Sequence, residues 1–202
     1  MKHTTNNYVN MFLVFHKNCI SSKFHTKKWR ELQEWYEGGR KNECEKFQRS
    51  LLENGLSCKV HKTNTRLDMT EYNLVVESKP LIKRGGFNYT EDFDGTWKDF
   101  GSVFYVNFKF ICDSGGAQNR SMREVYHFLL CQHMYLLNNP DINVYFVNIL
   151  DGDQGYKYTY NNFDEKKASL FDIQLKEKFV DVIDRVYIGD MKNFWSWYNK
   201  LE

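Results

Sequence analysis

The sequence contains very little proline, and no part of it has the composition of a linker. Only 2 of its 202 residues are proline, and no run rich in serine and glycine separates one part of the chain from another. A chain of this length usually forms one domain. We therefore expect a single domain over residues 1–202.

Long apolar runs are also absent. No stretch approaches the roughly 18 apolar residues that a membrane-spanning helix requires. Residues 11–15 (MFLVF) are apolar but too few, and they lack the flanking residues of a signal peptide. We expect no membrane partner.

Paired cysteines are missing. The chain has 5 cysteines, an odd number, and no two of them form a Cys-x-x-Cys pair. Disulfide frameworks and structural zinc sites both depend on paired cysteines, so neither is expected. This cysteine usage fits a reducing intracellular compartment, and we expect a cytoplasmic protein.

A strong excess of charge of one sign is absent too. The formal net charge is +2, so the chain lacks the basic field of a histone-like protein. Any contact with nucleic acid must then come from local patches.

Aromatic residues are abundant, and they mark the predicted core. The content of 42% hydrophobic and 17% aromatic residues is sufficient for a packed interior. Residues 27–53 have helical periodicity that Gly38-Gly39 interrupts, and Asn54-Gly55 is expected to end the second helix. Residues 72–77 are a further strand candidate.

The second half of the chain has the clearest pattern. Residues 103–111 are a nearly continuous run of aromatic and β-branched side chains, which is typical of a buried strand. A helix is predicted over residues 119–137 and a second buried strand over 143–150. This order predicts a parallel strand pair joined by a helical crossover. The cluster at 194–198 is expected to cap the core on a helix.

Two polar residues interrupt the strand at 103–111. Asn107 and Lys109 are two positions apart and therefore share one face of the strand. Lysine is rarely buried without a partner, so the pair indicates a functional site. The alternative is that Lys109 protects a sheet edge against aggregation.

Acidic residues precede this strand. Asp94-Gly95 is a common turn dipeptide, and Glu91 and Asp92 are ordinary surface acids when considered alone. Followed by a strand with a lysine, they fit metal-assisted cleavage of phosphodiesters. In that chemistry carboxylates hold a hard divalent cation and a lysine orients the attacking water.

A glycine pair and a basic helix follow the strand. The free N–H groups at the start of a helix attract phosphate, and arginine binds phosphate through two hydrogen bonds. Arginine in a first turn opposes the helix dipole, which an external anion would explain. An exposed first turn without function is the alternative. The residues expected to contact DNA are Gly116, Gln118, Asn119, Arg120, Arg123 and, in a basic loop further upstream, Lys83 and Arg84.

Two further features leave alternatives open. Glu124 either neutralises Arg120 one turn earlier or faces the strand and supplies a carboxylate. Tyr156, Tyr158 and Tyr160 either stack on bases or form a strand with one packed face.

The run from Asp94 through Asn107-x-Lys109, Ser-Gly-Gly, the basic helix and Asp151-Gly152-Asp153 resembles type II restriction endonucleases of the PD-(D/E)XK superfamily. The similarity covers about residues 85–160. It implies an α/β (α+β) fold with a mixed central sheet flanked by helices, as in restriction endonucleases. Residues 85–160 would then form the catalytic core, and residues 1–80 a mainly helical N-terminal part.

The resemblance also implies an activity, namely sequence-specific hydrolysis of double-stranded DNA with Mg²⁺, by a homodimer on a palindromic target. Asp94 corresponds to the metal-binding aspartate and Lys109 to the lysine beside the attacking water. Asn107 stands at the position of the second acid. The metal site would then be completed by Asn107 or by Glu124, or the chain is a weak or inactive DNA-binding protein of the same fold.

Overall fold

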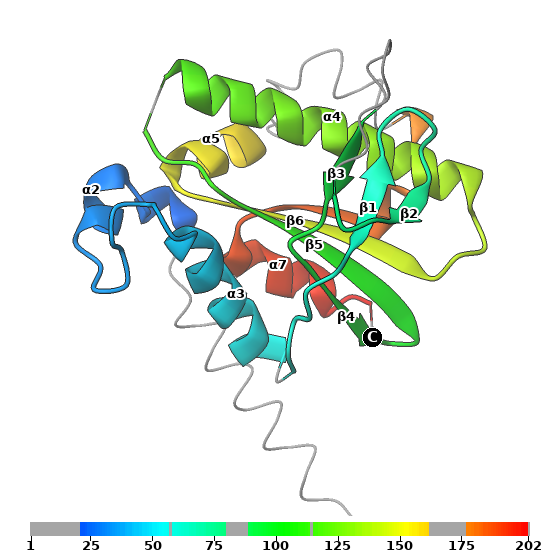
Figure 1. Cartoon of the computed structure of the whole chain (residues 1–202), viewed down its shortest axis with the longest axis horizontal. Helices are drawn as coiled ribbons and strands as arrows, with labels where there is room; N and C mark the ends of the chain where they lie inside the picture. The colour runs from blue at the N-terminus through cyan, green and yellow to red at the C-terminus, as the bar shows by residue number, and fades with distance from the viewer. Residues whose placement is uncertain (1–20, 57, 80–88, 114, 162–176, 202) are drawn as a thin grey trace, which may run out of the picture.

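A four-stranded mixed sheet forms the centre of the molecule (Figure 1). The computed structural model describes residues 21–56, 58–79, 89–113, 115–161 and 177–201. The sheet has the order β4-β5-β6-β7, in which β4 is antiparallel to β5 and the other neighbours are parallel. Its strands are β4 (Gly95–Asp99), β5 (Ser102–Phe110), β6 (Val144–Asp151) and β7 (Val186–Gly189).

A tight hairpin joins β4 to β5. Asp99 pairs with Ser102, so only Phe100 and Gly101 form the turn. Both have positive φ values, 49° and 69°, as a two-residue hairpin of type I′ requires. This turn places the start of β4 opposite the end of β5.

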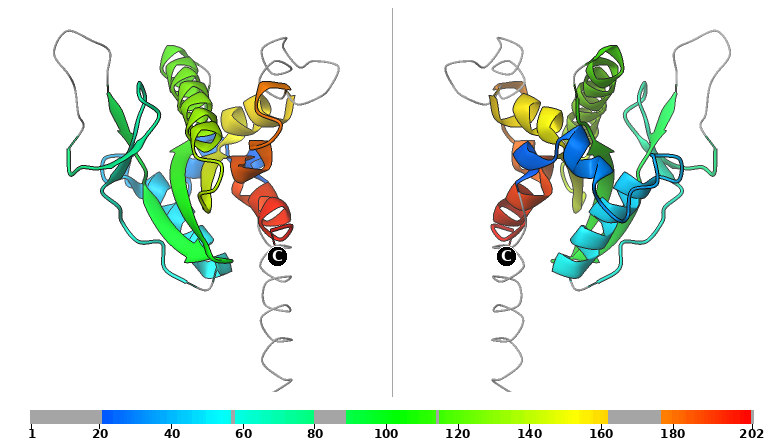
Figure 2. Two further views of the ribbon diagram at one scale, coloured as in Figure 1. Left: turned by 90° about the vertical axis from the view of Figure 1, so that its right-hand side faces the viewer. Right: turned by 90° about the vertical axis from the view of Figure 1, so that its left-hand side faces the viewer.

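Helices cover both faces of the sheet (Figure 2). The long helix α4 (Gly116–Asn138) lies on one face, where Phe146 and Leu150 of β6 belong to its core cluster. The helices α3 (Glu43–Leu56) and α7 (Met191–Tyr198) pack on the other face, against Phe104 and Val106. Side chains alternate between these two cores along each strand.

The predicted fold class is confirmed, since the described residues form an α/β arrangement with a mixed sheet. The strand expected over residues 103–111, the following helix and the next strand correspond to β5, α4 and β6. Strands β5 and β6 are parallel, as predicted. The predicted C-terminal helix is α7.

A second, antiparallel sheet packs beside α4. It has the order β2-β1-β3 and consists of β1 (Thr65–Asp68), β2 (Leu74–Val76) and β3 (Thr90–Asp92). Leu67 and Met69 join the core beneath α4. The strand expected over residues 72–77 is β2, so the N-terminal part contains strands as well as helices.

The N-terminal helices cover fewer residues than the helical periodicity of residues 27–53 predicts. Helix α2 covers only Lys27–Glu31, and α3 begins at Glu43. Gly38 and Gly39 lie between them with φ values of 95° and 79°, so the predicted break is confirmed.

The predicted role of Gly55 is wrong, because this residue lies inside α3 rather than after it. A Cβ atom at this position would lie 2.3 Å from the Trp195 indole. Small size, not backbone conformation, is what the position requires.

The tyrosines after β6 lie on a helix. Helix α5 covers Asp153–Asn161, so the predicted strand at this place is wrong. Short 3-10 turns at Ser22–Phe24 and Ile183–Arg185 complete the elements.

The start of α5 is held against the end of β5 through backbone atoms. The carbonyl oxygen of Ile111 accepts hydrogen bonds from the N–H groups of Gln154 (3.2 Å) and Gly155 (3.1 Å). Gly152 lies between the strand and this helix with φ of 93°, and a Cβ there would lie 2.2 Å from the Ile111 oxygen. Only glycine permits this approach.

None of the described helices is both long and apolar enough to cross a membrane. The cysteines in the described part of the chain, Cys44, Cys58, Cys112 and Cys131, carry free thiols.

Candidate functional site at the carboxyl edge of the sheet

The predicted site residues meet at one edge of the central sheet. Strands β5 and β6 are parallel, so their carboxyl ends lie at the same edge. Strand β4 begins there because it runs antiparallel to β5, and α4 begins a few residues after β5. The carboxyl edge is the usual place for ligands in parallel sheets of this kind.

Both the backbone and the side chain of Asp94 form hydrogen bonds with β5. Its N–H group donates to the carbonyl oxygen of Val106 at 2.8 Å. Its Oδ2 atom accepts a hydrogen bond of 2.6 Å from the N–H group of Phe108. The carboxylate is thereby held beside the segment that carries Asn107 and Lys109.

The environment of Asp94 favours its protonated form. Burial raises the pKa of Asp94 to about 6, against the lowering effect of the Phe108 N–H group. Glu45 of α3 raises this pKa further, and the ammonium group of Lys109 lowers it. A carboxyl group that titrates near neutral pH beside a lysine is typical of a functional site.

Lys109 and Asn107 lie on the same face of β5, as the two-residue spacing predicts, and this face packs against α4. In the parallel register Asn107 lies beside Asn148, whose side chain bonds Gln132 of α4 at 2.8 and 3.2 Å. Lys109 is half-buried, whereas Asn107 is only 4% exposed.

Lys109 also acts on Glu91, an acid of β3. Burial raises the pKa of Glu91, and Lys109 lowers it. The structure therefore places two carboxyl groups, Asp94 and Glu91, within electrostatic range of one lysine. Sequence reasoning grouped Glu91 with the acids that fit metal-assisted cleavage but assigned it no role of its own, because the three-residue strand β3 has no recognisable pattern.

Glu45 is the second acid that sequence reasoning missed. It is half-buried on α3 and forms an ion pair of 3.1 Å with Arg49, which also donates to the backbone carbonyl of Asp94. An acid in the first turn of a helix is common. No signal in the sequence could have linked it to Asp94.

Glu124 lies on the exposed face of α4 and not beside Asp94. Its charge acts on Glu91 and Tyr89, whose pKa values are raised first by burial and then by neighbouring groups that include Glu124. Glu124 is thus a neighbour of Glu91 at the rim of the site.

The carboxylates do not form a complete metal-binding cage. Within the described segments no group of three or more His, Cys, Asp or Glu side chains is close enough to hold a metal ion. Magnesium, however, is usually bound by one or two protein carboxylates, with water and substrate phosphates as its other ligands. Asp94 alone meets this smaller requirement.

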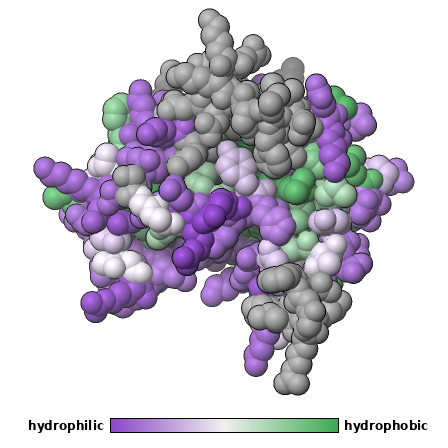
Figure 3. Space-filling model, turned by 90° about the horizontal axis from the view of Figure 1, so that it is seen from above, coloured by the Kyte–Doolittle hydropathy of each residue, from purple (hydrophilic) through white to green (hydrophobic). Residues whose placement is uncertain are grey.

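The residues expected to contact DNA are accessible at the start of α4. Gly116, Asn119, Arg120 and Arg123 are exposed, and Gln118 is half-buried. Figure 3 shows hydrophilic side chains over much of the face seen from the side of α4. Lys83 and Arg84 lie outside the described residues.

A pocket of about 300 Å³ opens between the start of α4 and α2. Lys27 and Arg30 of α2 line it together with Gln118 of α4, while Lys27 forms an ion pair of 3.7 Å with Asp113. Cations and free helix N–H groups make this place suitable for phosphate.

Asp151 does not belong to this site, although it ends the neighbouring strand. Its side chain accepts hydrogen bonds from Gln48 of α3 at 2.9 Å and from the N–H group of Met191 in α7 at 3.1 Å. It lies on the face opposite Lys109 and is 1% exposed. Burial raises its pKa to about 7.

The chain was compared with models of protein families, with curated proteins and with solved structures, and none of the three comparisons gave a match.

Proposed function

We propose that this protein is a metal-dependent nuclease that hydrolyses phosphodiester bonds in double-stranded DNA. The observation that carries the proposal is the position of Asp94. Its carboxylate is bonded to the β5 backbone, within electrostatic range of the half-buried Lys109. Strand pairing, and not proximity in sequence, brings these two groups together.

Each residue has a role that follows from its place. Asp94 would hold magnesium, which would stabilise negative charge that develops on the phosphate. Lys109 would orient the attacking water and hold it near the phosphorus. Arg120, Arg123 and the N–H groups at the start of α4 would bind the flanking phosphates.

The proposed restriction activity adds one requirement, a homodimer. Discrete cleavage of a palindromic sequence requires a homodimer, because each protomer then cuts one strand. A measurement of molar mass in solution by light scattering would show whether the chain forms that dimer.

A second candidate is a DNA-binding protein of the same fold without hydrolysis. The buried amide of Asn107 favours it, since an amide brings no negative charge to a metal ion. The absence of a cluster of three or more His, Cys, Asp or Glu side chains within the described residues also favours the DNA-binding protein.

The experiment is incubation of the full chain with plasmid DNA and MgCl₂, beside a sample with chelator. Discrete fragments that disappear with chelator support the restriction nuclease, whereas a smear indicates cleavage without sequence preference. Intact DNA that is retarded in a gel supports the binding protein. Intact and unretarded DNA would contradict both.

A further inference from the structure

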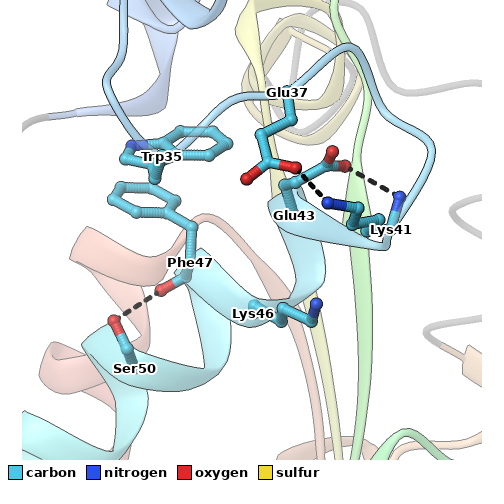
Figure 4. Close-up of a pocket in the computed structure, with 7 residues that line it drawn as sticks. All are labelled: Trp35, Glu37, Lys41, Glu43, Lys46, Phe47 and Ser50. Carbon is cyan, nitrogen blue, oxygen red and sulfur yellow. Dashed lines mark hydrogen bonds and ion pairs between the residues drawn. The ribbon is translucent and has the colours of Figure 1, made fainter.

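A second pocket, remote in sequence from Asp94 and Lys109, lies at the start of α3 (Figure 4). Its volume is about 320 Å³, within the range of small-ligand sites. Its lining comes from the segment before α3 and from the first turns of that helix. None of its lining residues belongs to the Asp94–Lys109 site.

Two stacked rings form one side of this pocket. The rings of Trp35 and Phe47 are nearly parallel, at 10°, with their centroids 4.5 Å apart. Both side chains are half-buried, so part of each ring is accessible. Aromatic rings in this position are suited to stack on a nucleobase.

Glu43 supplies a polar group on the other side. The residue is only 6% exposed, and its Oε2 atom accepts a hydrogen bond of 3.3 Å from the N–H group of Lys41. Its Oε1 atom is buried and forms no hydrogen bond of ordinary geometry within the described part of the chain, although the backbone N–H groups of Glu43 and Arg40 also act on the carboxylate. Buried polar atoms nearly always have a partner, so this oxygen indicates a place for a donor from a ligand.

The carboxyl group of Glu43 is ionised at neutral pH. Backbone N–H groups, first that of Glu43 itself, lower its pKa, and the ammonium group of Lys46 acts in the same direction. An ionised carboxylate only accepts hydrogen bonds. The matching ligand therefore presents donors on adjacent atoms.

Among the nucleobases this condition selects guanine. Its N1–H and N2–H₂ groups are neighbouring donors, whereas adenine, cytosine and uracil each place an acceptor beside a donor on that edge. The N1–H and N2–H₂ groups of guanine would donate hydrogen bonds to the Oε1 atom and to the second lone pair of the Oε2 atom of Glu43.

Two lysines at the pocket are able to bind a phosphate. Lys41 and Lys46 are exposed and line the pocket, where they balance the carboxylates of Glu37 and Glu43. Lys41 forms an ion pair of 2.6 Å with Glu37, but both side chains are more than half exposed. Such surface pairs are weak, so Lys41 is able to turn toward a phosphate.

We propose that this pocket binds guanosine phosphates, with the base between the Trp35–Phe47 stack and Glu43 and the phosphate on Lys41 and Lys46. The guanosine phosphate is either a free nucleotide or part of a nucleic-acid strand. The proposal does not depend on the nuclease activity.

The test is calorimetric titration of the full chain with GDP, ADP, CDP and UDP. We expect GDP to bind about tenfold or more tightly than each of the others, as for a good pair of hydrogen bonds to one base. In Glu43→Gln this preference should disappear, because the amide presents a donor to the guanine edge. Glu37→Gln is the matched control and should keep the preference.

Two further arms complete the test. If GDP does not bind, a short single-stranded oligonucleotide with one guanine replaces it, and binding that depends on Glu43 assigns the site to a strand.

Lys109→Ala should leave binding unchanged, which separates this proposal from the nuclease. Equal binding of the four nucleotides by the native chain, or no binding of either guanine probe, would overturn the proposal without reliance on any variant.

Discussion

Asp94 and Asp151 are two acids at the same edge of one sheet, and their surroundings differ in an instructive way. Burial raises the pKa of both, to about 6 for Asp94 and about 7 for Asp151. Asp151 is buried between α3 and α7 and bonds to both helices. Asp94 is partly accessible and lies within electrostatic range of Lys109, so it has a chemical partner as well as a raised pKa.

The comparison shows that a raised pKa does not by itself identify a functional carboxylate. Structural carboxylates are perturbed by the same burial that perturbs catalytic ones. Access to solvent and a neighbouring cation distinguish Asp94, whereas bonds to two helices make Asp151 a structural group. Four experiments test whether this division of roles is correct.

The largest effect is expected on cleavage. Lys109→Ala and Asp94→Asn should lower the rate of plasmid cleavage by about a hundredfold or more, as the loss of a group at the reacting centre does. DNA binding in a gel-shift assay should remain. Lys98→Ala, which alters an exposed lysine of β4, is the control and should cleave normally. Full activity in Lys109→Ala would remove Lys109 from the mechanism.

The next effect concerns stability and Asp151. Asp151→Ala leaves the buried N–H group of Met191 without an acceptor, which should cost about 1–3 kcal/mol. The side-chain amide of Gln48 loses one hydrogen bond but keeps those to the backbone carbonyls of Lys109 and Ile149. Urea denaturation would measure the loss of unfolding free energy. If Asp151→Ala instead abolished cleavage with unchanged stability, the division between the two acids would be wrong.

The pH dependence of cleavage should follow Asp94. Its carboxylate must be ionised to hold a cation, and its pKa is raised to about 6. The rate should therefore rise with pH through this value and level off above it, with about a tenfold loss at pH 5 relative to neutral pH. Initial rates at constant ionic strength and at a fixed Mg²⁺ concentration well below saturation would test this, because a bound cation lowers the pKa of its carboxylate ligand. A flat profile between pH 5 and 7 would contradict a required ionisation of Asp94.

The last effect is a pH dependence of stability that Asp151 causes. Its pKa is raised from 3.8 to about 7 on folding, so the folded state holds the proton more tightly than the unfolded state. The contribution of this group to stability is therefore full below pH 3.8 and is lost as the pH rises toward 7.

Unfolding free energies of the native chain and of Asp151→Asn at several pH values would reveal this contribution. The native chain should lose stability relative to the variant between pH 4 and 7, because asparagine does not titrate in this range. A constant difference between the two proteins would mean that Asp151 does not titrate there.

The central unit of the fold was predictable because its signals are local. The aromatic run that forms β5 and the long periodic helix α4 are patterns of one segment each, and they predict their elements independently of the rest. Strands β1, β3 and β7 are three or four residues long and have no such pattern. Pairing with distant segments, and not sequence period, makes them strands.

The candidate site was predictable to the same extent. Asn107 and Lys109 share a strand, so their common face followed from spacing alone. Glu91 and Glu45 approach the site only through the pairing of β3 and the packing of α3. The prediction for Gly55 was wrong for a related reason, since the sequence does not show that the Trp195 indole lies against it.

The contact between Gly152 and Ile111 has a consequence for how this protein tolerates mutation. The backbone carbonyl of Ile111 follows directly after the strand that carries Lys109. Gly152 lies so close to this carbonyl that no side chain larger than a hydrogen atom fits there. In a scan of substitutions scored by activity, Gly152 should therefore be as intolerant as Lys109, although it has no reactive group. Such a scan would therefore mark Gly152 as catalytic. Thermal melting would reveal the difference between the two positions. Gly152→Ala should melt at a lower temperature than the native chain, whereas Lys109→Ala should not.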